Sequence, residues 1–142
     1  MLLASEGRPF DEEAVRLAAR LARGRRGHVR VLSIARMWGT SFGLPHPGLL
    51  PNKREMAEYE SNVAKAVRAL KRAGVSADGH IISTRKPTKS ILGEAERQEC
   101  EAIVMGADAR RTWLVGDFMR SQEPYRVRRR ARVPVYLVGQ DG

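Results

Sequence analysis

The sequence contains one cysteine, few aromatic residues and no long apolar run, and each of these scarcities excludes a class of protein. Cys100 has no second cysteine with which to form an intramolecular disulfide, so a disulfide framework is excluded and a reducing compartment is predicted. No stretch reaches the roughly 18 to 20 apolar residues of a membrane span, and residues 1–6 contain no long apolar signal segment. We therefore expect a soluble cytoplasmic protein with no membrane partner.

Acidic residues are also scarce relative to basic ones, since 16 Asp and Glu stand against 26 Lys and Arg and leave a net charge of +10. Such a charge attracts phosphates and nucleic acid. However, aromatic residues, which stack on bases, make up only 6% of the chain. The 142 residues are 42% apolar, which suffices for one hydrophobic core, so residues 1–142 are expected to form a single domain.

Apolar residues recur at helical spacing in several segments, each of which is predicted to be an amphipathic helix. In the first, Asp11, Glu12 and Glu13 occupy the first turn, where acidic side chains favour the helix dipole. Pro87 is suited to the first turn of the third. The predicted helices span residues 10–23, 53–73, 87–99 and 121–132.

Short apolar or alternating runs separate these helices and are predicted to be strands. The run at residues 102–105 is continuously apolar, as in a strand that is buried on both faces, and Gly106 is expected to end it. Residues 37–52 are rich in glycine and proline and predict a long loop, in which Trp38 and Phe42 either cover a ligand site or anchor the loop on the core. The predicted strands span residues 2–4, 28–34, 77–84, 102–105 and 133–138.

Strands and helices therefore alternate along the whole chain, which predicts an α/β fold. The expected architecture is a single doubly wound, mainly parallel five-stranded sheet with helices on both faces, a Rossmann-like arrangement. Ligands of such sheets bind beyond the carboxyl ends of the strands, at the point where the strand order reverses. The segments expected at that edge are residues 5–7, the loop that begins at Arg36 or Met37, and the segment that begins at Gly106.

Four segments, in order and at matching separations, resemble the universal stress protein family. Residues 2–7 resemble its opening strand, which usually ends in Val-Asp-Gly-Ser, and Lys86-Pro87 resembles the Gly-Asp-Pro start of its third helix. Residues 102–106 and 132–138 resemble its Asp-Leu-Ile-Val-Met-Gly strand and its Cys-Pro-Val-Leu-Val-Val ending. The resemblance covers nearly the whole chain. It implies an adenine nucleotide alpha hydrolase-like fold and a homodimer, often formed through the last strand, here Val133, Val135 and Leu137.

Members of that family that bind ATP share a glycine motif, in which Gly, two residues, Gly, nine residues and Gly are followed by Ser or Thr. Glycines let the chain approach phosphates, and loop amides with a helix N-terminus receive their charge. Here Gly106 fits the first position, but Ala109 occupies the second, and counting onward reaches Met119 and Arg120. Counting back from Pro134 instead places Ser121 and Gln122 at the end of the motif. The resemblance thus implies a degenerate ATP-binding motif.

Two interpretations of this motif stay open: a surviving site for ATP or another adenine nucleotide, or a loop that is retained only for its shape. Glu6 stands where the family usually has Asp, which keeps the charge but extends the side chain by one methylene. The residues that the resemblance implies for the nucleotide site are Ser5, Glu6, Met105, Gly106, Ala109, Ser121 and Gln122.

Arginine is frequent where the glycines are missing, with eight arginines against three acidic residues between Gly106 and Arg132. Guanidinium groups bind phosphate or carboxylate bidentately, so Arg110, Arg111 and Arg120 are candidates to hold a phosphorylated or other anionic small molecule. The run from Arg126 to Arg132 is interpreted either as a solvated helix face or as a contact for RNA, DNA or an acidic partner. The scarcity of aromatic residues disfavours nucleic acid.

Three functions follow from these observations. The first is a stress-response binding or regulatory protein without a catalytic cycle, since the sequence has no Gly-x-Ser-x-Gly elbow and no Gly-Lys-Ser/Thr phosphate loop. The second is an adenine-nucleotide-binding member of the same family with weak or no hydrolysis, and the third is a basic nucleic-acid-associated protein. The three histidines lack metal-ligand spacing, so no metal site is expected. Cys100 is predicted to be buried and inert.

Overall fold

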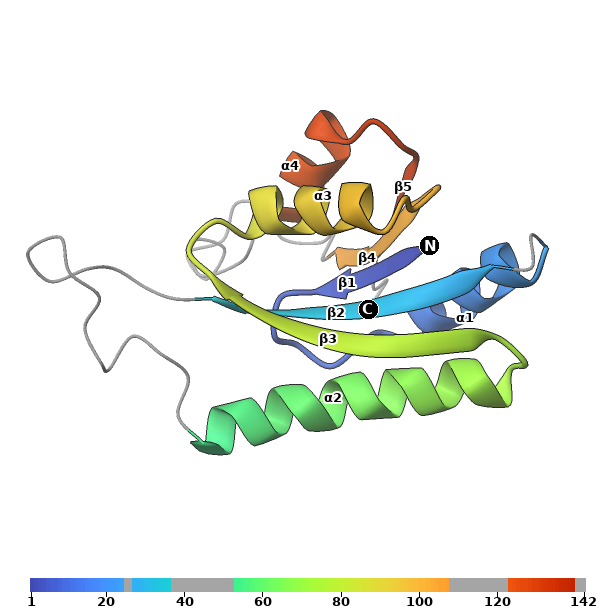
Figure 1. Cartoon of the computed structure of the whole chain (residues 1–142), viewed down its shortest axis with the longest axis horizontal. Helices are drawn as coiled ribbons and strands as arrows, with labels where there is room; N and C mark the ends of the chain where they lie inside the picture. Colours follow the sequence, from blue (N-terminus) through green and yellow to red (C-terminus); the bar gives the residue numbers. More distant parts are fainter. Residues whose placement is uncertain (25–26, 37–52, 108–122, 140–142) are drawn as a thin grey trace, which may run out of the picture.

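The computed structural model describes residues 1–24, 27–36, 53–107 and 123–139, which form five strands and four helices (Figure 1). Trp38 and Phe42 lie outside the described residues. The elements are, in chain order, β1 (Leu2–Ser5), α1 (Glu12–Arg23), β2 (His28–Arg36), α2 (Lys53–Arg72), β3 (Ser76–Thr84), α3 (Pro87–Arg97), β4 (Ile103–Ala107), α4 (Glu123–Arg130) and β5 (Val135–Gly139).

The five strands form one sheet in the order β3-β2-β1-β4-β5, and every neighbouring pair is parallel. The chain first builds outward from β1 through β2 to β3, and then returns to the other side of β1 to add β4 and β5. The strand order therefore reverses between β1 and β4. This confirms the predicted doubly wound parallel sheet and fixes its reversal point.

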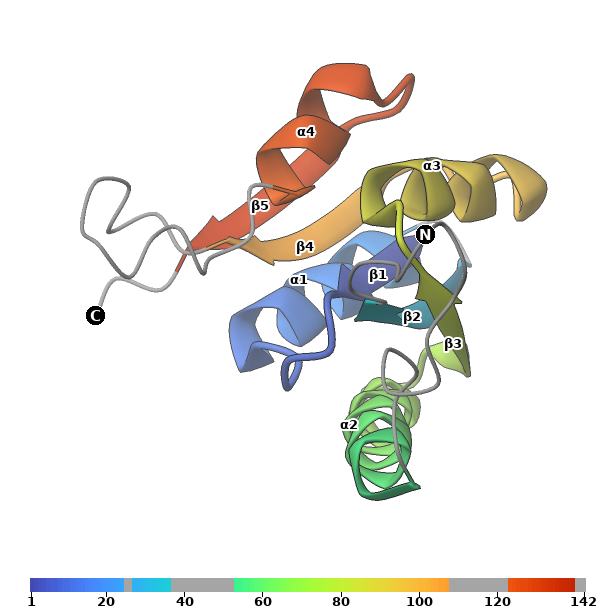
Figure 2. The ribbon, with the colours of Figure 1, turned by 90° about the vertical axis from the view of Figure 1, so that its left-hand side faces the viewer.

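Two helices cover each face of the sheet, with α3 and α4 above it and α1 and α2 below it in Figure 2. Alternate residues of each strand point to opposite faces, so the strands contribute to both cores. The core under α1 and α2 includes Leu3, Val31 and Val104 from the strands, and the core under α3 and α4 includes Leu2, Leu32 and Ile103. All six side chains are fully buried.

The first helix begins where its sequence predicts a cap. Asp11 has an extended backbone, with φ −63° and ψ 133°, and its carboxylate accepts a hydrogen bond from the backbone N–H of Glu13 at 2.8 Å. Glu12 and Glu13 then lie in the first turn and Arg20 and Arg23 in the last, as the helix dipole favours. The helix thus starts at Glu12 and not at residue 10, because Asp11 is the capping residue.

The prediction that Gly106 ends the fourth strand is wrong. Strand β4 continues through Gly106 to Ala107, and Gly106 lies opposite Val138 in the ladder with β5. Parallel pairing on β5 holds the glycine in extended conformation, which overrides its tendency to interrupt strands. The other boundaries agree with prediction to within two residues. Among the described residues, no helix is long and apolar enough to cross a membrane.

Helix α2 lies unusually close to the edge strand β3 at Gly79. A Cβ added to this residue would fall well inside contact distance of Cγ1 of Val63. Because Gly79 has no side chain, α2 packs closely on β3, and Val63 is buried at this contact.

Candidate functional site

The carboxyl ends of β1 and β4 lie side by side at the reversal point of the sheet. Their ladder pairs Leu2 with Ile103, Leu3 with Val104 and Ala4 with Met105. Ser5 and Glu6 therefore leave β1 next to the place where Gly106 lies in β4. Of the residues predicted for the nucleotide site, the structure brings Ser5, Glu6, Met105 and Gly106 to this edge. Ala109, Arg110, Arg111, Arg120, Ser121 and Gln122 lie outside the described residues.

The segment after β1 turns sharply at this edge. The Ser5 hydroxyl donates a hydrogen bond to the backbone carbonyl of Arg8 at 2.8 Å, and Gly7 has a positive φ of 78° that glycine adopts without strain. The Ser5 hydroxyl is thus already used to hold the turn. The backbone of the turn and Glu6 within it also lie next to β4.

Tyr59 of α2 packs against this turn, a contact that the sequence analysis missed. A Cβ added to Gly7 would lie 2.8 Å from Cε1 of Tyr59, so a larger residue would collide with the ring. Burial raises the pKa of the Tyr59 phenol, and the nearby carboxylates of Glu55 and Glu58 raise it further. The phenol therefore stays neutral at physiological pH. The sequence marks Tyr59 only as one of the periodic apolar positions of its helix.

Gly106 and Met105 have different surroundings although they are adjacent. Met105 is 1% exposed and packs in the core under α3 and α4. Gly106 is exposed, and among the described residues a Cβ added to it would meet only Cβ of Asp11, at the ordinary contact distance of 3.9 Å. Met105 is therefore a core residue, while Gly106 leaves space between β4 and the start of α1.

Ser33 is a second residue that the sequence analysis missed. It lies beside Ser5 in the ladder between β1 and β2, near the same edge of the sheet. Its side chain is fully buried, and its hydroxyl has no hydrogen-bond partner in the described part of the chain. A buried hydroxyl without a partner is costly, so a polar ligand atom or an ordered water would be stabilised beside it.

The three residues predicted for a dimer interface face the molecule's own core. Val133, Val135 and Leu137 are partly buried and pack against the core under α3 and α4. Tyr136 points to the opposite face and is 39% exposed, the only large apolar side chain classed as exposed among the described residues. No strand in the described part of the chain pairs with the outer edge of β5, because β5 ends the sheet.

A groove with a volume of about 1000 Å³ lies along α1 and α2. Its lining includes Pro9 and Phe10, which precede α1, and none of the residues predicted for the nucleotide site. The candidate site is the β1 and β4 edge and not this groove, because ligands of doubly wound sheets bind where the strand order reverses. The rest of the groove is lined by Glu12, Glu13, Val15, Arg16, Leu17, Ala19, Arg20, Arg23, Asn62, Lys65, Ala66, Ala69, Ala73 and Val138.

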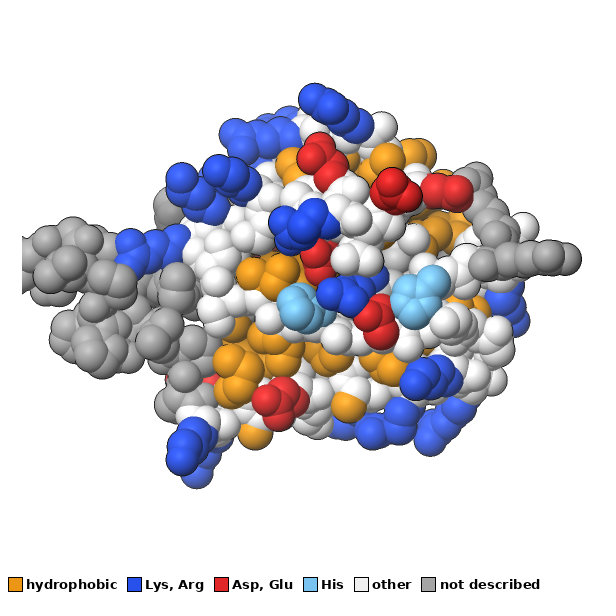
Figure 3. Space-filling view, viewed as in Figure 1, with side chains coloured by type: hydrophobic (Ala, Val, Ile, Leu, Met, Phe, Trp, Pro, Cys, Tyr) orange, Lys and Arg blue, Asp and Glu red, His pale blue; other side chains and the backbone are white. Residues whose placement is uncertain are grey.

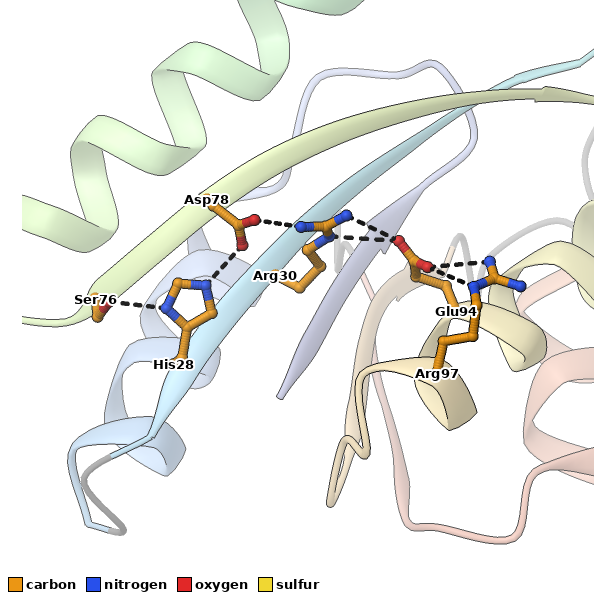
Figure 4. Close-up of polar contacts among 6 residues, drawn as sticks. All are labelled: His28, Arg30, Ser76, Asp78, Glu94 and Arg97. Carbon is orange, nitrogen blue, oxygen red and sulfur yellow. Dashed lines mark hydrogen bonds and ion pairs between the residues drawn. The ribbon is translucent and has the colours of Figure 1, made fainter.

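A chain of charged side chains crosses β2 and β3 on the face shared with α3, where Figure 3 shows histidine, basic and acidic side chains together. Arg30 of β2 forms ion pairs with Asp78 of β3 and, at 3.3 Å, with Glu94 of α3. Glu94 is only 3% exposed and also pairs with Arg97 at 3.0 Å (Figure 4). A carboxylate this deeply buried is tolerated because two guanidinium groups neutralise it.

His28 extends this network toward the end of β2. Its Nε2 donates to the Asp78 carboxylate at 2.6 Å, and its Nδ1 shares a hydrogen bond of 2.8 Å with the Ser76 hydroxyl (Figure 4). Ser, His and Asp in this order resemble a hydrolase relay. In such a relay the carboxylate stabilises the positive charge of the imidazolium. Here the Asp78 carboxylate is already paired with Arg30. The arrangement therefore ties β2 to β3.

Asp78 and Cys100, which lie away from the β1 and β4 edge, have shifted pKa values. Burial acts to raise the pKa of Asp78, but the His28 hydrogen bond and the Arg30 charge outweigh it and hold the pKa below 3.8. Burial raises the pKa of the Cys100 thiol, and Cys100 is 8% exposed. The burial predicted for Cys100 is confirmed, and the raised pKa keeps the thiol protonated.

The sequence as a whole matches a known family. A model of the universal stress protein family matches residues 1–139. No curated protein matches the chain significantly.

Solved structures share its fold at low identity. A universal stress protein from Archaeoglobus fulgidus is 20% identical, with a TM-score of 0.73 over 96% of this chain and 90% of that one. The universal stress protein from Archaeoglobus fulgidus in complex with dAMP is 21% identical, with a TM-score of 0.70 over 96% and 94%. A family protein from Arabidopsis thaliana with AMP bound is 14% identical, with a TM-score of 0.66 over 100% and 93%.

Proposed function

This chain belongs to the universal stress protein family, and from that premise we propose that it is a cytoplasmic stress-response binding protein for an adenine nucleotide, without a conventional catalytic cycle. The observation that carries the proposal is the open position of Gly106 at the reversal point of the sheet. Gly106 lies in β4 beside the end of β1, and Asp11 is the only residue in the described part of the chain within contact distance of an added Cβ. Ligands of doubly wound sheets bind at this point.

The ligand that fits best carries few phosphates. Two of the three glycines of the ATP motif are replaced, since Ala109 stands at the second position and Met119 or Ser121, depending on the register, at the third. A side chain in place of a glycine keeps the backbone amides of a phosphate loop farther from the phosphates. This weakens the binding of a triphosphate more than that of a monophosphate, because a triphosphate depends on more such contacts. Two of the similar solved structures hold dAMP and AMP, which supports a nucleoside monophosphate. In this proposal Arg110, Arg111 and Arg120 supply positive charge toward the phosphate.

The orphaned hydroxyl of Ser33 supports a polar ligand at this edge. Ser33 is fully buried beside Ser5, and a ligand hydroxyl or ring nitrogen would satisfy it at little cost. Glu6 of the adjacent turn offers a carboxylate, which accepts hydrogen bonds from ribose hydroxyls.

The outer edge of β5 supports a homodimer as the working form. Strand β5 ends the sheet with five residues whose outer backbone groups no described strand pairs. An unpaired edge is a template for pairing with a second copy. In this arrangement Val133, Val135 and Leu137 support the strand from the core side, and the contact itself is made by backbone groups and Tyr136.

Isothermal titration with AMP, ADP and ATP tests nucleotide binding. We expect AMP to bind at least as tightly as ATP, and Gly106→Ala to weaken AMP binding because the added methyl group enters the space between β4 and α1. The described residues leave room for that methyl group, since the nearest of their atoms is 3.9 Å away. Gly93→Ala in α3 is the matched control and should leave binding unchanged. Absence of heat with all three nucleotides at millimolar concentration would contradict the proposal.

A further inference from the structure

Helix α4 displays a cluster of arginines that the nucleotide site does not use. Its buried residue Val127 is 0% exposed and anchors the helix in the core under α3 and α4. The arginines of α4 around this anchor are exposed, and Figure 3 shows basic side chains along the rim of the molecule where α4 lies. The exposed arginines of this surface, called the α4 arginine surface below, are Arg128, Arg129, Arg130 and Arg132.

These four arginines form no ion pair in the described part of the chain. Among the other described arginines, Arg30 and Arg97 pair with Glu94, and Arg16 pairs with Glu12. Residues 124–139 contain no Asp or Glu. The surface therefore carries four positive charges that no described ion pair balances.

The helix dipole accounts for part of this pattern. Arg128, Arg129 and Arg130 lie in the last turn of α4, where cations are favourable. Arg132 lies beyond the helix, outside the reach of that effect on the last turn. The dipole also gives no reason for three adjacent arginines where one would suffice.

The chemistry around the cluster favours nucleic acid over an acidic protein. Protein interfaces contain an apolar centre. The only large apolar side chain classed as exposed in the described residues is Tyr136, which points to the other face of the sheet. Guanidinium groups bind phosphate bidentately, and phosphate contacts require no apolar centre.

We propose that the α4 arginine surface binds the phosphate backbone of double-stranded nucleic acid without sequence preference. Single strands are held largely by bases stacked on aromatic side chains. In α4 the only aromatic residue is Tyr125, which is partly buried. A duplex exposes its phosphates and hides its base faces, which matches a surface that offers charge alone.

Salt dependence measures this contact directly. Each neutralised phosphate of duplex DNA contributes about −0.9 to the slope of log affinity against log salt concentration. Four arginines therefore predict a slope of about −3.6, so raising salt from about 50 to about 200 mM should weaken binding about 150-fold. This measurement needs no nucleotide and is independent of the site at β1 and β4.

Fluorescence anisotropy with a 20-base-pair duplex of arbitrary sequence, in a salt series, tests the proposal. The triple variant Arg128→Gln, Arg129→Gln, Arg130→Gln should reduce the slope to about −0.9, so that the same rise in salt costs only about 3.5-fold. The triple Arg→Lys variant keeps the charge and should keep the steep slope. Thermal unfolding of each variant establishes that α4 still packs through Val127.

A matched control separates this surface from the overall charge of +10. Arg68→Gln with Arg72→Gln removes exposed charges from α2, on the opposite face of the sheet, and should leave the slope nearly unchanged. An equal fall in slope with the control would overturn the proposal, as would absence of duplex binding at low salt. Tighter binding of an acidic peptide or of a single strand of the same length would also overturn it.

Discussion

Arg30 of β2 and Glu94 of α3 are joined by an ion pair of 3.3 Å at a point where the Glu94 side chain is 3% exposed. The pair links the helix to the sheet across 64 residues of sequence. Because Arg30 also binds Asp78 of β3, one guanidinium holds β2, β3 and α3 together. These ion pairs help to fix the position of α3 on the sheet.

Removal of the buried carboxylate should be costly. Glu94→Gln leaves Arg30 and Arg97 without a charged acceptor, and we expect the free energy of unfolding to fall by about 2 to 3 kcal/mol. Arg97→Gln should cost less than about 1 kcal/mol, because the Arg97 side chain is 62% exposed. Urea unfolding measures both. Glu96→Gln is the control on the exposed side of the same helix, and an equal loss with it would contradict the role of burial.

Acid should weaken the contact between β2 and β3 through Asp78. The folded state holds the pKa of Asp78 below the ordinary 3.8, so ionised Asp78 stabilises the protein above that value and the stabilisation is lost as pH falls through the lower, folded value. Asp78→Asn should therefore be less stable than the wild type at about pH 5, with a gap that narrows as pH falls further. Urea midpoints across this range measure the gap, and a gap that widens on acidification would refute the prediction.

A methyl group at Gly79 should separate α2 from β3. Gly79→Ala places its Cβ against Val63, and overpacking of this kind costs about 1 to 3 kcal/mol. Val63→Ala in the same chain removes the collision, so the double variant should lose less stability than the two single variants combined. Gly93→Ala, whose added Cβ meets Arg97 at 3.4 Å, is the control and should not destabilise α3. Strict additivity in the cycle would show that the two residues do not collide.

Removal of the Ser33 hydroxyl, which has no hydrogen-bond partner among the described residues, should not destabilise the protein. Ser33→Ala should leave the free energy of unfolding unchanged or raise it by up to about 1 kcal/mol, because the lost hydroxyl has no partner among the described residues. Ser5→Ala, which removes the bond to Arg8, should instead cost about 1 kcal/mol. Titration with AMP completes the test, since Ser33→Ala should weaken binding. A large loss of stability in Ser33→Ala would show that the hydroxyl is already bonded.

Charge beside the outer edge of β5 should dissociate the proposed dimer. Tyr136→Lys places like charges near one another when two β5 strands pair, and Tyr136 is exposed enough to change without disturbing the core. Light scattering after size exclusion should give the mass of a dimer for the wild type and of a monomer for the variant. Ser83→Lys, exposed on the opposite edge strand, should remain dimeric. A monomeric wild type would rule out the interface.

The sequence was sufficient for the fold and for part of the candidate site. Apolar periodicity and helix caps are local properties, so every helix and strand could be placed, and the resemblance of residues 2–7 and 102–106 identified the two strands that meet. Contacts between distant segments leave no local pattern. The Tyr59 ring against Gly7, the unpartnered Ser33 hydroxyl and the Arg30 pair with Glu94 became visible only once the strands were in register. The prediction that Gly106 ends the strand was wrong because its ladder partner in β5, Val138, lies 32 residues later in the sequence.

The free edge of β5 also determines what a second copy would do to α4. Two β5 strands that pair antiparallel are related by a two-fold axis perpendicular to the sheet, which keeps both α4 helices on the same side of a continuous ten-stranded surface. Arginines on the two copies would then engage one duplex together, and the salt dependence would be steeper than the slope of about −3.6 that the four arginines of one copy predict. Once the first copy is attached, binding of the second copy is intramolecular. A dimer would therefore bind a duplex more tightly than a single α4 helix does.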